Sequence, residues 1–178
     1  MLGDFVKGTP ESLAGHFPPA VVQGIRLHRA VDRFTDAHPA FHEAKKLLAP
    51  ERRRFAGLIV DIIFDHLLIK NWARYHEQPL ADFLAEIYEQ FDAHPQLLTP
   101  RMATLLPRLK AENWLGINES LAGLSTTMSR VSTRRPFLRV IKDAHLDFTR
   151  QPERFDKHFL CLYPDLIRLA TRQTSEHS

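Results

Sequence analysis

Apolar residues recur along this chain at intervals of three and four positions, which is the spacing of one face of an α-helix. The clearest run covers Ala20 to Ala37, with Pro19 before it and His38-Pro39 after it. Because proline suits the first helical position and disfavours helix in the residue that precedes it, these prolines predict the ends of one helix. No segment alternates apolar and polar residues between turn signals, as a half-buried strand does. The pattern therefore predicts an all-α fold.

Further helices follow from the same spacing. They are predicted at residues 2–8, 40–48, 50–76, 79–94, 100–110, 113–131, 136–148 and 152–172. A proline inside a helix removes a hydrogen bond and clashes with the preceding turn, so Pro107 is expected to bend or interrupt its helix and Pro164 to divide the last one. No repeat or linker separates parts of the chain. We therefore expect residues 1–178 to form a single domain, a helical bundle of about seven to nine helices.

The most apolar segment, residues 59–69, carries two carboxylates one helical turn apart. At about 100° per residue Asp61 and Asp65 share a face, and His66 lies just beside Asp65. Apolar residues surround them, so we expect this helix in the core, where solvent is absent and an ionised carboxylate is costly unless a cation or strong donors meet it. A metal would meet both carboxylates. The alternatives are a buried pair bridged by arginine side chains and, for His66, a core histidine bonded to a backbone carbonyl.

A second polar group is spaced by four along the helix predicted after Pro19: His28, Asp32 and Asp36. These side chains lie within an arc of about 80°, and Asp4 adds a candidate near the chain start. Two helices that each present histidine and aspartate can enclose a divalent ion, since imidazole and carboxylate suit Mn²⁺, Fe²⁺ or Zn²⁺. The alternative is a solvated helix face on which Arg29 and Arg33 pair with the carboxylates.

Arg134 and Arg135 precede Pro136 in a turn between two predicted helices. Guanidinium groups bind phosphate oxygens in pairs, so these residues are candidates for a phosphate clamp. Equally, they could cap the end of the preceding helix.

The composition is that of a globular domain, with 178 residues, 44% hydrophobic and 25% charged. No apolar run approaches the roughly 20 residues of a membrane span, and the start is no secretory signal, so we expect a cytoplasmic protein without membrane association. A net charge of +3 permits an acidic partner. Basic residues are not interleaved with aromatic ones in one stripe, so nucleic-acid binding is not expected. The oligomeric state is not indicated.

Several segments occur in an order and spacing that resembles a known family. They are Gly3-Asp4-Phe5-Val6-Lys7-Gly8, Phe17-Pro18-Pro19, Gly24-Ile25-Arg26-Leu27-His28-Arg29 with Asp32, Thr35-Asp36, His38-Pro39, Asp61, Asp65-His66 and Trp72. The match is dense from Gly3 to Trp72 and thinner afterwards. On these residues the chain resembles the acyl carrier protein phosphodiesterases, which are regarded as divergent relatives of the helical HD-type metal-dependent phosphohydrolases.

The resemblance implies an HD-phosphohydrolase-like bundle that removes the 4′-phosphopantetheine arm from holo-acyl carrier protein, with Mn²⁺ as the favoured metal. It implies a metal site lined by Asp4, His28, Asp32, Asp65 and His66, with Asp61 and Asp36 bound to the ion or to its ligands. Asp65-His66 reverses the usual His-Asp order, so ligand roles do not transfer directly. Family members usually carry a further histidine-containing segment before Gly3, and we expect activity to depend on whether that segment supplies a ligand.

The mechanism expected is metal-assisted phosphodiester hydrolysis, in which the ion polarises a phosphoryl oxygen and lowers the pKa of bound water. Asp32 or Asp61 would deprotonate that water, and Arg134 or Arg135 would offset charge on the phosphate. Two alternatives stay open. One is an HD-like phosphohydrolase acting on a nucleotide or small phosphodiester, and the other is a non-catalytic helical module that binds an acidic partner.

Overall fold

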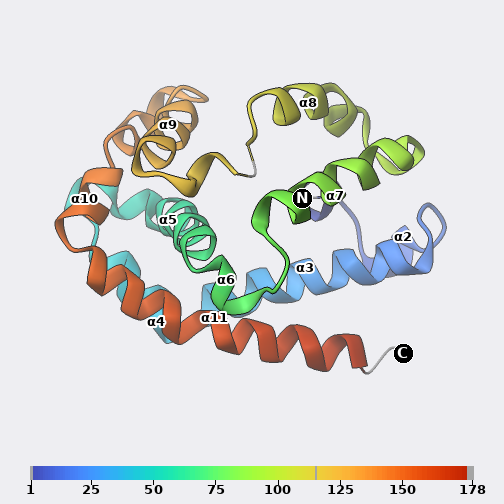
Figure 1. Ribbon diagram of the computed structural model, residues 1–178, viewed down its shortest axis with the longest axis horizontal. Helices are drawn as coiled ribbons and strands as arrows, with labels where there is room; N and C mark the ends of the chain where they lie inside the picture. The colour runs from blue at the N-terminus through green and yellow to red at the C-terminus, as the bar shows by residue number, and fades with distance from the viewer. Residues whose placement is uncertain (1, 115, 176–178) are drawn as a thin grey trace.

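The computed structural model describes residues 2–114 and 116–175, apart from the side chains of Leu2, Asp4, Pro10 and Glu11. Within these residues every regular element is helical (Figure 1). The prediction of an all-α fold is therefore confirmed. No helix in the described part is both long and apolar enough to cross a membrane.

The α-helices are labelled α and the 3₁₀ helices η. In chain order they are α1 (Leu2–Phe5), α2 (Pro10–Leu13), α3 (Pro19–Ala37), α4 (Pro39–Lys46), η1 (Pro50–Phe55), α5 (Ala56–Lys70), α6 (Trp72–Tyr75), α7 (Leu80–Ala93), η2 (Pro95–Leu97), α8 (Pro100–Ala111), η3 (Ile117–Glu119), α9 (Leu121–Ser132), η4 (Pro136–Ile141), α10 (His145–Arg150) and α11 (Pro152–Ser175). Helices α1, α2 and α6 are single turns of four residues.

Helix α3 has the predicted ends, but the helix predicted for residues 50–76 is divided into η1, α5 and α6. Phe55 and Asn71, at the two divisions, depart from α-helical backbone angles. At Asn71 the side-chain amide donates to the carbonyl of Leu67, 2.8 Å away, and such a bond competes with continuation of the helix. The segment predicted as one helix at 136–148 is likewise divided, into η4 and α10.

The predicted division of the last helix at Pro164 is wrong, because α11 continues through it to Ser175. A proline removes one hydrogen bond, and Phe155, Phe159 and Leu162 of the same helix are buried against neighbouring helices. Packing on both the core and α3 therefore holds α11 together across Pro164.

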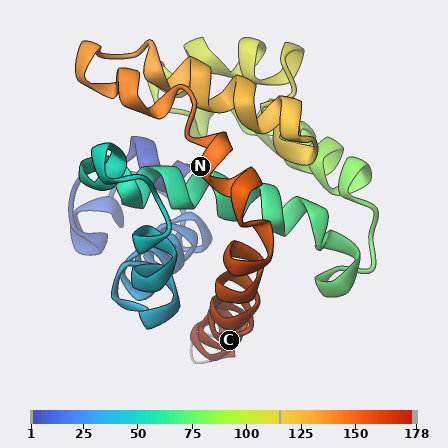
Figure 2. The ribbon, with the colours of Figure 1, turned by 90° about the vertical axis from the view of Figure 1, so that its left-hand side faces the viewer.

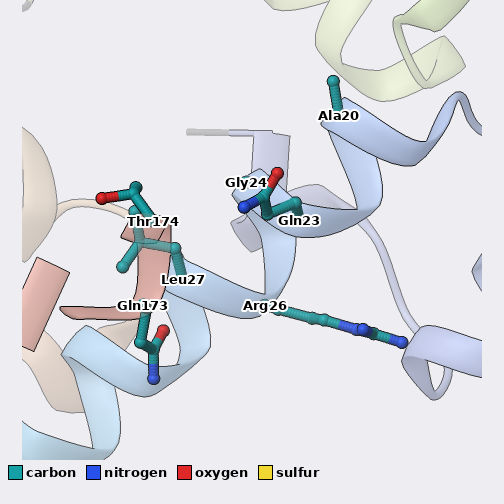
Figure 3. A pocket seen from close by; sticks show the side chains of 7 residues that line it. All are labelled: Ala20, Gln23, Gly24, Arg26, Leu27, Gln173 and Thr174. Carbon is teal, nitrogen blue, oxygen red and sulfur yellow. The ribbon is translucent and has the colours of Figure 1, made fainter. Parts of the chain in front are cut away.

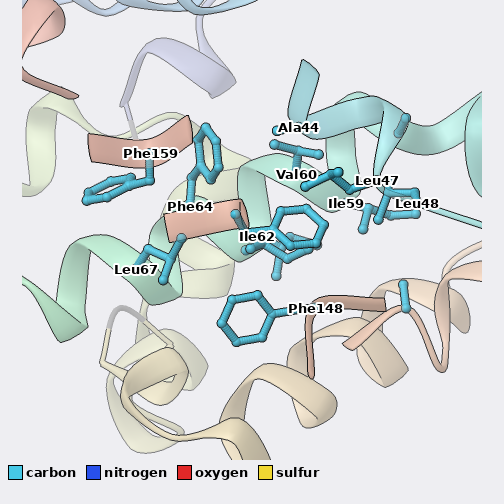
Figure 4. Packing of buried hydrophobic residues seen from close by; sticks show 14 of the residues in the cluster. Ala44, Leu47, Leu48, Ile59, Val60, Ile62, Phe64, Leu67, Phe148 and Phe159 are labelled. Carbon is cyan, nitrogen blue, oxygen red and sulfur yellow. The ribbon is translucent and has the colours of Figure 1, made fainter. Parts of the chain in front are cut away.

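Helix α5 occupies the middle of the fold. Helices α9 and η3 lie against one side of it, and α4 and α11 lie against the other (Figures 1 and 2). The ring of Phe64 packs between those of Phe41 and Phe159, with centroids 6.0 and 5.7 Å away. Figure 4 shows Phe64 and Phe159 among the buried side chains around α5. Each such buried side chain stabilises the fold by about 1.5–3 kcal/mol. The core thus holds α5 firmly on both sides.

A smaller core attaches the N-terminal segment to α3. It consists of Val6, Leu13, Val22 and Ile25. The guanidinium of Arg29 donates to the carbonyl of Gly8 at 2.7 Å and to that of Val6 at 3.0 Å. Gly8 has a φ of 112°, a conformation that favours glycine. These contacts place α1 beside the middle of α3.

Candidate functional site

Four carboxylates line one pocket between α3, α5 and α11, with a volume of about 680 Å³. Asp32 and Asp36 come from α3, and Asp61 and Asp65 come from α5. Helix α11 supplies apolar side chains and the ring of Tyr163 to the wall. The fold thus brings together the two acidic pairs that lie far apart in the sequence. We call this the carboxylate pocket.

The direction of the α5 carboxylates follows from the apolar residues of that helix. Ile59, Ile63 and Leu67 are fully buried. At about 100° per residue, the face that they form lies about 180° from the face of Asp61 and Asp65. Burial of the one face therefore points the other toward the gap between α3 and α11.

The expectation that solvent is absent from the face of Asp61 and Asp65 is wrong. Both side chains are exposed, because this face opens into the carboxylate pocket instead of packing against another helix. Arginine side chains do not line this pocket, so the predicted alternative of a buried pair bridged by arginine is not what the described residues form.

The surroundings of both α5 carboxylates raise their pKa. Water reaches them through the open side of the pocket, but the protein on the other sides limits their hydration, and this is the largest cause in both cases. The pKa of Asp61 is raised to about 6, with further contributions from Asp36 and then Asp32. The pKa of Asp65 is raised to about 7, with the charge of Asp61 as the second cause. Both groups therefore hold their protons more tightly than an ordinary aspartate, and a cation in the pocket would stabilise their ionised forms.

His28 lies at the edge of this group, where Nε2 is 3.2 Å from Oδ2 of Asp32. Its ring lies against Gly3 of α1, where an added Cβ would overlap Cδ2 of His28 and lie 2.8 Å from Cγ. A glycine is therefore needed for α1 to pass this close to α3. The side chain of Asp4, the next residue, lies outside the described residues, so its role as a metal ligand stays a prediction.

The alternative of a solvated helix face required Arg29 to pair with the carboxylates of α3. Its guanidinium instead donates to the carbonyls of Val6 and Gly8. That arginine holds the N-terminal segment in place.

His66 faces away from the carboxylate pocket, toward η3 and α10. It is buried, its Nδ1 lies 2.6 Å from the carbonyl oxygen of Asn118, and its ring packs edge-on against Phe148. These contacts are those of a core histidine bonded to a backbone carbonyl. A metal-ligating role for His66 stays a prediction that these contacts do not support.

Arg134 and Arg135 line two other pockets at the end of α9. Arg134 lines one pocket with Trp114, and Arg135 lines the other with Arg139 of η4 and with Lys142. Helix α5 stands between α9 and the pair of helices α4 and α11 in both views (Figures 1 and 2). Neither arginine therefore lines the carboxylate pocket, and the phosphate clamp stays a prediction.

Tyr163 is a polar residue of the pocket that the sequence reasoning missed. Burial raises the pKa of its hydroxyl, with the neighbouring Tyr75 as a smaller cause, so the group stays protonated at neutral pH and can donate a hydrogen bond. It comes from α11, about a hundred residues after Asp61, and no spacing in the sequence relates the two.

The donor chemistry of the pocket fits a divalent cation, since carboxylate oxygens are ligands of Mg²⁺ and Mn²⁺. The described side chains lie farther apart than the ligands of a formed metal site. Among the described side chains, no group of three or more His, Cys, Asp or Glu is gathered closely enough to hold an ion.

A further pocket, of about 350 Å³, lies between α3 and the end of α11 (Figure 3). Among the described residues its lining includes Gln23, Arg26 and Gln173 and no carboxylate.

Fold and pocket together define the class of this protein: an all-α domain with a candidate active site of carboxylates contributed by two helices and covered by a third. A family profile described as acyl carrier protein phosphodiesterase matches residues 1–166. The chain therefore belongs to the acyl carrier protein phosphodiesterase family, as its resemblance predicted.

Individual relatives agree with this assignment. Proteins named acyl carrier protein phosphodiesterase from Salmonella dublin and Escherichia coli are each 31% identical over 174 residues, which cover 97% of this chain and 89% of theirs. No solved structure matches the chain.

Proposed function

We propose that this chain hydrolyses the phosphodiester bond that joins 4′-phosphopantetheine to the serine of acyl carrier protein and leaves apo-acyl carrier protein. The observation that carries the proposal is the meeting of two acidic pairs in one open pocket, in a member of a family named for this substrate. Carboxylates with a raised pKa in a pocket are typical of acid–base sites.

A divalent metal, Mn²⁺ in our proposal, is part of this function. Asp36 and Asp65 would hold it, Asp61 would lie beside it as the base, and Asp32 would be oriented by His28. When bound, the ion supplies a Lewis acid for the phosphoryl group and lowers the pKa of a coordinated water. The support for it is the mutual repulsion of the carboxylates, which a cation would relieve.

The residues of the chain have two further tasks in this proposal. Asp61, whose pKa is about 6, is mostly ionised at neutral pH and can accept the proton of the attacking water. Tyr163 lines the same pocket, and its hydroxyl can donate a hydrogen bond to a phosphoryl oxygen.

The test is the intact mass of holo-acyl carrier protein after incubation with this protein and Mn²⁺, with a chelator control. We expect a metal-dependent loss of the mass of phosphopantetheine. Hydrolysis of small phosphodiesters without hydrolysis of the carrier would instead favour the HD-like phosphohydrolase. No hydrolysis, together with no thermal shift on adding Mn²⁺, would favour the binding module.

A further inference from the structure

A second pocket, of about 400 Å³, adjoins the carboxylate pocket. Asp65 and Leu68 of α5 line both. The remaining lining of the second pocket comes from the end of α5, from Trp72, from α7, and from Trp114 and Asn118. We call it the apolar pocket, because Asp65 is the only charged residue among the described residues that line it.

Helix α7 presents an apolar face to this pocket. Phe83, Leu84, Ile87 and Phe91 lie at helical spacing and line it. No residue of α7 is buried, so the protein covers this face only in part. In Figure 1 α7 stands apart from the packed helices around α5. An apolar face that lines a pocket next to a reactive site is suited to the apolar part of a ligand.

The two tryptophans give the pocket firm apolar walls. Trp72 packs against Phe83 with ring centroids 4.9 Å apart, and its Nε1 donates to the carbonyl of Gln78. Trp114 donates from Nε1 to Glu112. Because both indole donors bind protein groups, the tryptophans contribute mainly apolar surface to the lining. The guanidinium groups of Arg108 and Arg130 also lie over the ring of Trp114, 5.7 and 5.8 Å from its centroid.

Asn118 is the one uncharged amide side chain among the residues described as lining this pocket. Its Oδ1 accepts a hydrogen bond from the hydroxyl of Thr127 at 2.7 Å, which fixes the orientation of the amide. A mostly apolar lining with one fixed amide suits an amphipathic chain that contains amide groups.

We propose that the apolar pocket binds the pantetheine arm of the carrier protein while the phosphodiester lies in the carboxylate pocket. This inference rests on the proposed function. The arm is an amphipathic chain with a dimethyl group beside the phosphate, two amides and a terminal thiol. Since Asp65 and Leu68 line both pockets, the pantetheine arm can pass from one pocket to the other without leaving the protein surface. Holding the arm there positions the phosphorus against the carboxylates.

The test traps the thiol of the arm with a cysteine placed in the apolar pocket. The chain's only cysteine, Cys161, is exposed and is first replaced, as Cys161→Ser. Ile87→Cys places a thiol in the pocket, and Ala85→Cys, on the exposed face of the same helix, is the matched control. The probe is holo-acyl carrier protein whose terminal thiol is activated as a mixed disulfide with pyridine-2-thiol, with chelator present to prevent hydrolysis.

Each trapping rate is divided by the rate of the same variant with 2,2′-dithiodipyridine, which corrects for thiol reactivity. We expect the corrected rate at position 87 to exceed that at position 85 at least tenfold. Equal corrected rates would overturn the proposal. Circular dichroism and thermal melting show whether each variant is folded, and Phe91→Cys replaces Ile87→Cys if that variant is not.

A second measurement fills the pocket. Leu84→Phe is expected to raise the KM for holo-acyl carrier protein several-fold, whereas Ala85→Phe leaves it unchanged. An unchanged KM in both would count against the proposal. Trapping needs no hydrolysis, so selective trapping by a protein that does not hydrolyse the carrier would support the arm site and reject the proposed function. Hydrolysis of the carrier without selective trapping would support the proposed function and reject the arm site.

Discussion

Asp65 combines a position at both pockets with a raised pKa. Its carboxylate lies at the wall shared by the two pockets, and its pKa is raised to about 7 by limited hydration and by Asp61. A carboxylate in such a position can bind a cation or exchange a proton near neutral pH, which a surface aspartate cannot do as readily.

Asp65→Asn tests this role. The amide keeps the size of the side chain but loses the negative charge, so we expect hydrolysis of holo-acyl carrier protein to fall at least about a hundredfold and the Mn²⁺-induced thermal shift to shrink. Circular dichroism should be unchanged. Asp143→Asn, at an exposed aspartate before α10, is the control and should keep full activity. Full activity in Asp65→Asn would remove this residue from the mechanism.

Gly3 is the second residue with a definite geometric role, because a Cβ there would overlap the ring of His28. Gly3→Ala should displace that ring from Asp32, reduce hydrolysis, and destabilise the protein by about 1–3 kcal/mol through overpacking. Gly15→Ala is the matched control, since nothing lies within 4 Å of its added Cβ. Urea denaturation and the hydrolysis assay measure both effects, and equal behaviour of the two variants would contradict the close contact.

At the scale of the elements, the join between α3 and α4 depends on His38. Its Nδ1 accepts a hydrogen bond from the backbone of Ala40, which caps α4, and its Nε2 lies 3.2 Å from Asp165 of α11. The neutral ring thus serves as acceptor at one nitrogen and donor at the other. Burial lowers the pKa of His38 below its ordinary value of 6.5.

This arrangement predicts how stability changes with pH. Because the folded-state pKa of His38 is lower than the unfolded value, its contribution is complete above about pH 6.5 and is lost as the pH falls through the folded-state pKa. We expect a loss of about 1 kcal/mol, the usual value of a helix cap. His38→Asn keeps a capping oxygen that does not titrate, so its urea midpoint should fall less than that of the wild type between pH 7 and pH 5. An equal fall in both would show that His38 is not the group responsible.

The helix ends show which boundaries can be predicted from the neighbouring residues alone. Prolines at the starts of α3 and α8 marked real helix starts, because their effect acts on the adjacent residues. Pro164 lies in the interior of α11, where burial of Phe159 and Leu162 outweighs the loss of one hydrogen bond. The division at Asn71 depends on a side-chain bond to Leu67 that the periodicity of apolar residues does not reveal.

At the scale of the whole molecule, the net charge of +3 bears on the encounter with a carrier protein. Carrier proteins of this type are acidic, and long-range attraction accelerates association and is screened by salt. We expect kcat/KM for holo-acyl carrier protein to fall several-fold between roughly 50 mM and roughly 500 mM salt, while kcat changes little. A kcat/KM that is independent of salt would contradict a steered encounter.

The sequence by itself determined the all-α class, the limits of α3, the pairing of Asp32 with Asp36 and of Asp61 with Asp65, and the family. These depend on spacing within one helix or on motifs read in order. The tertiary structure alone decided that the two acidic pairs share a pocket, that His66 faces Asn118 on the other side of α5, and that Arg134 and Arg135 lie beyond that helix. The physical reason is that spacing sets the angle between residues around one helix axis, whereas long-range packing sets which face of that helix meets which neighbour.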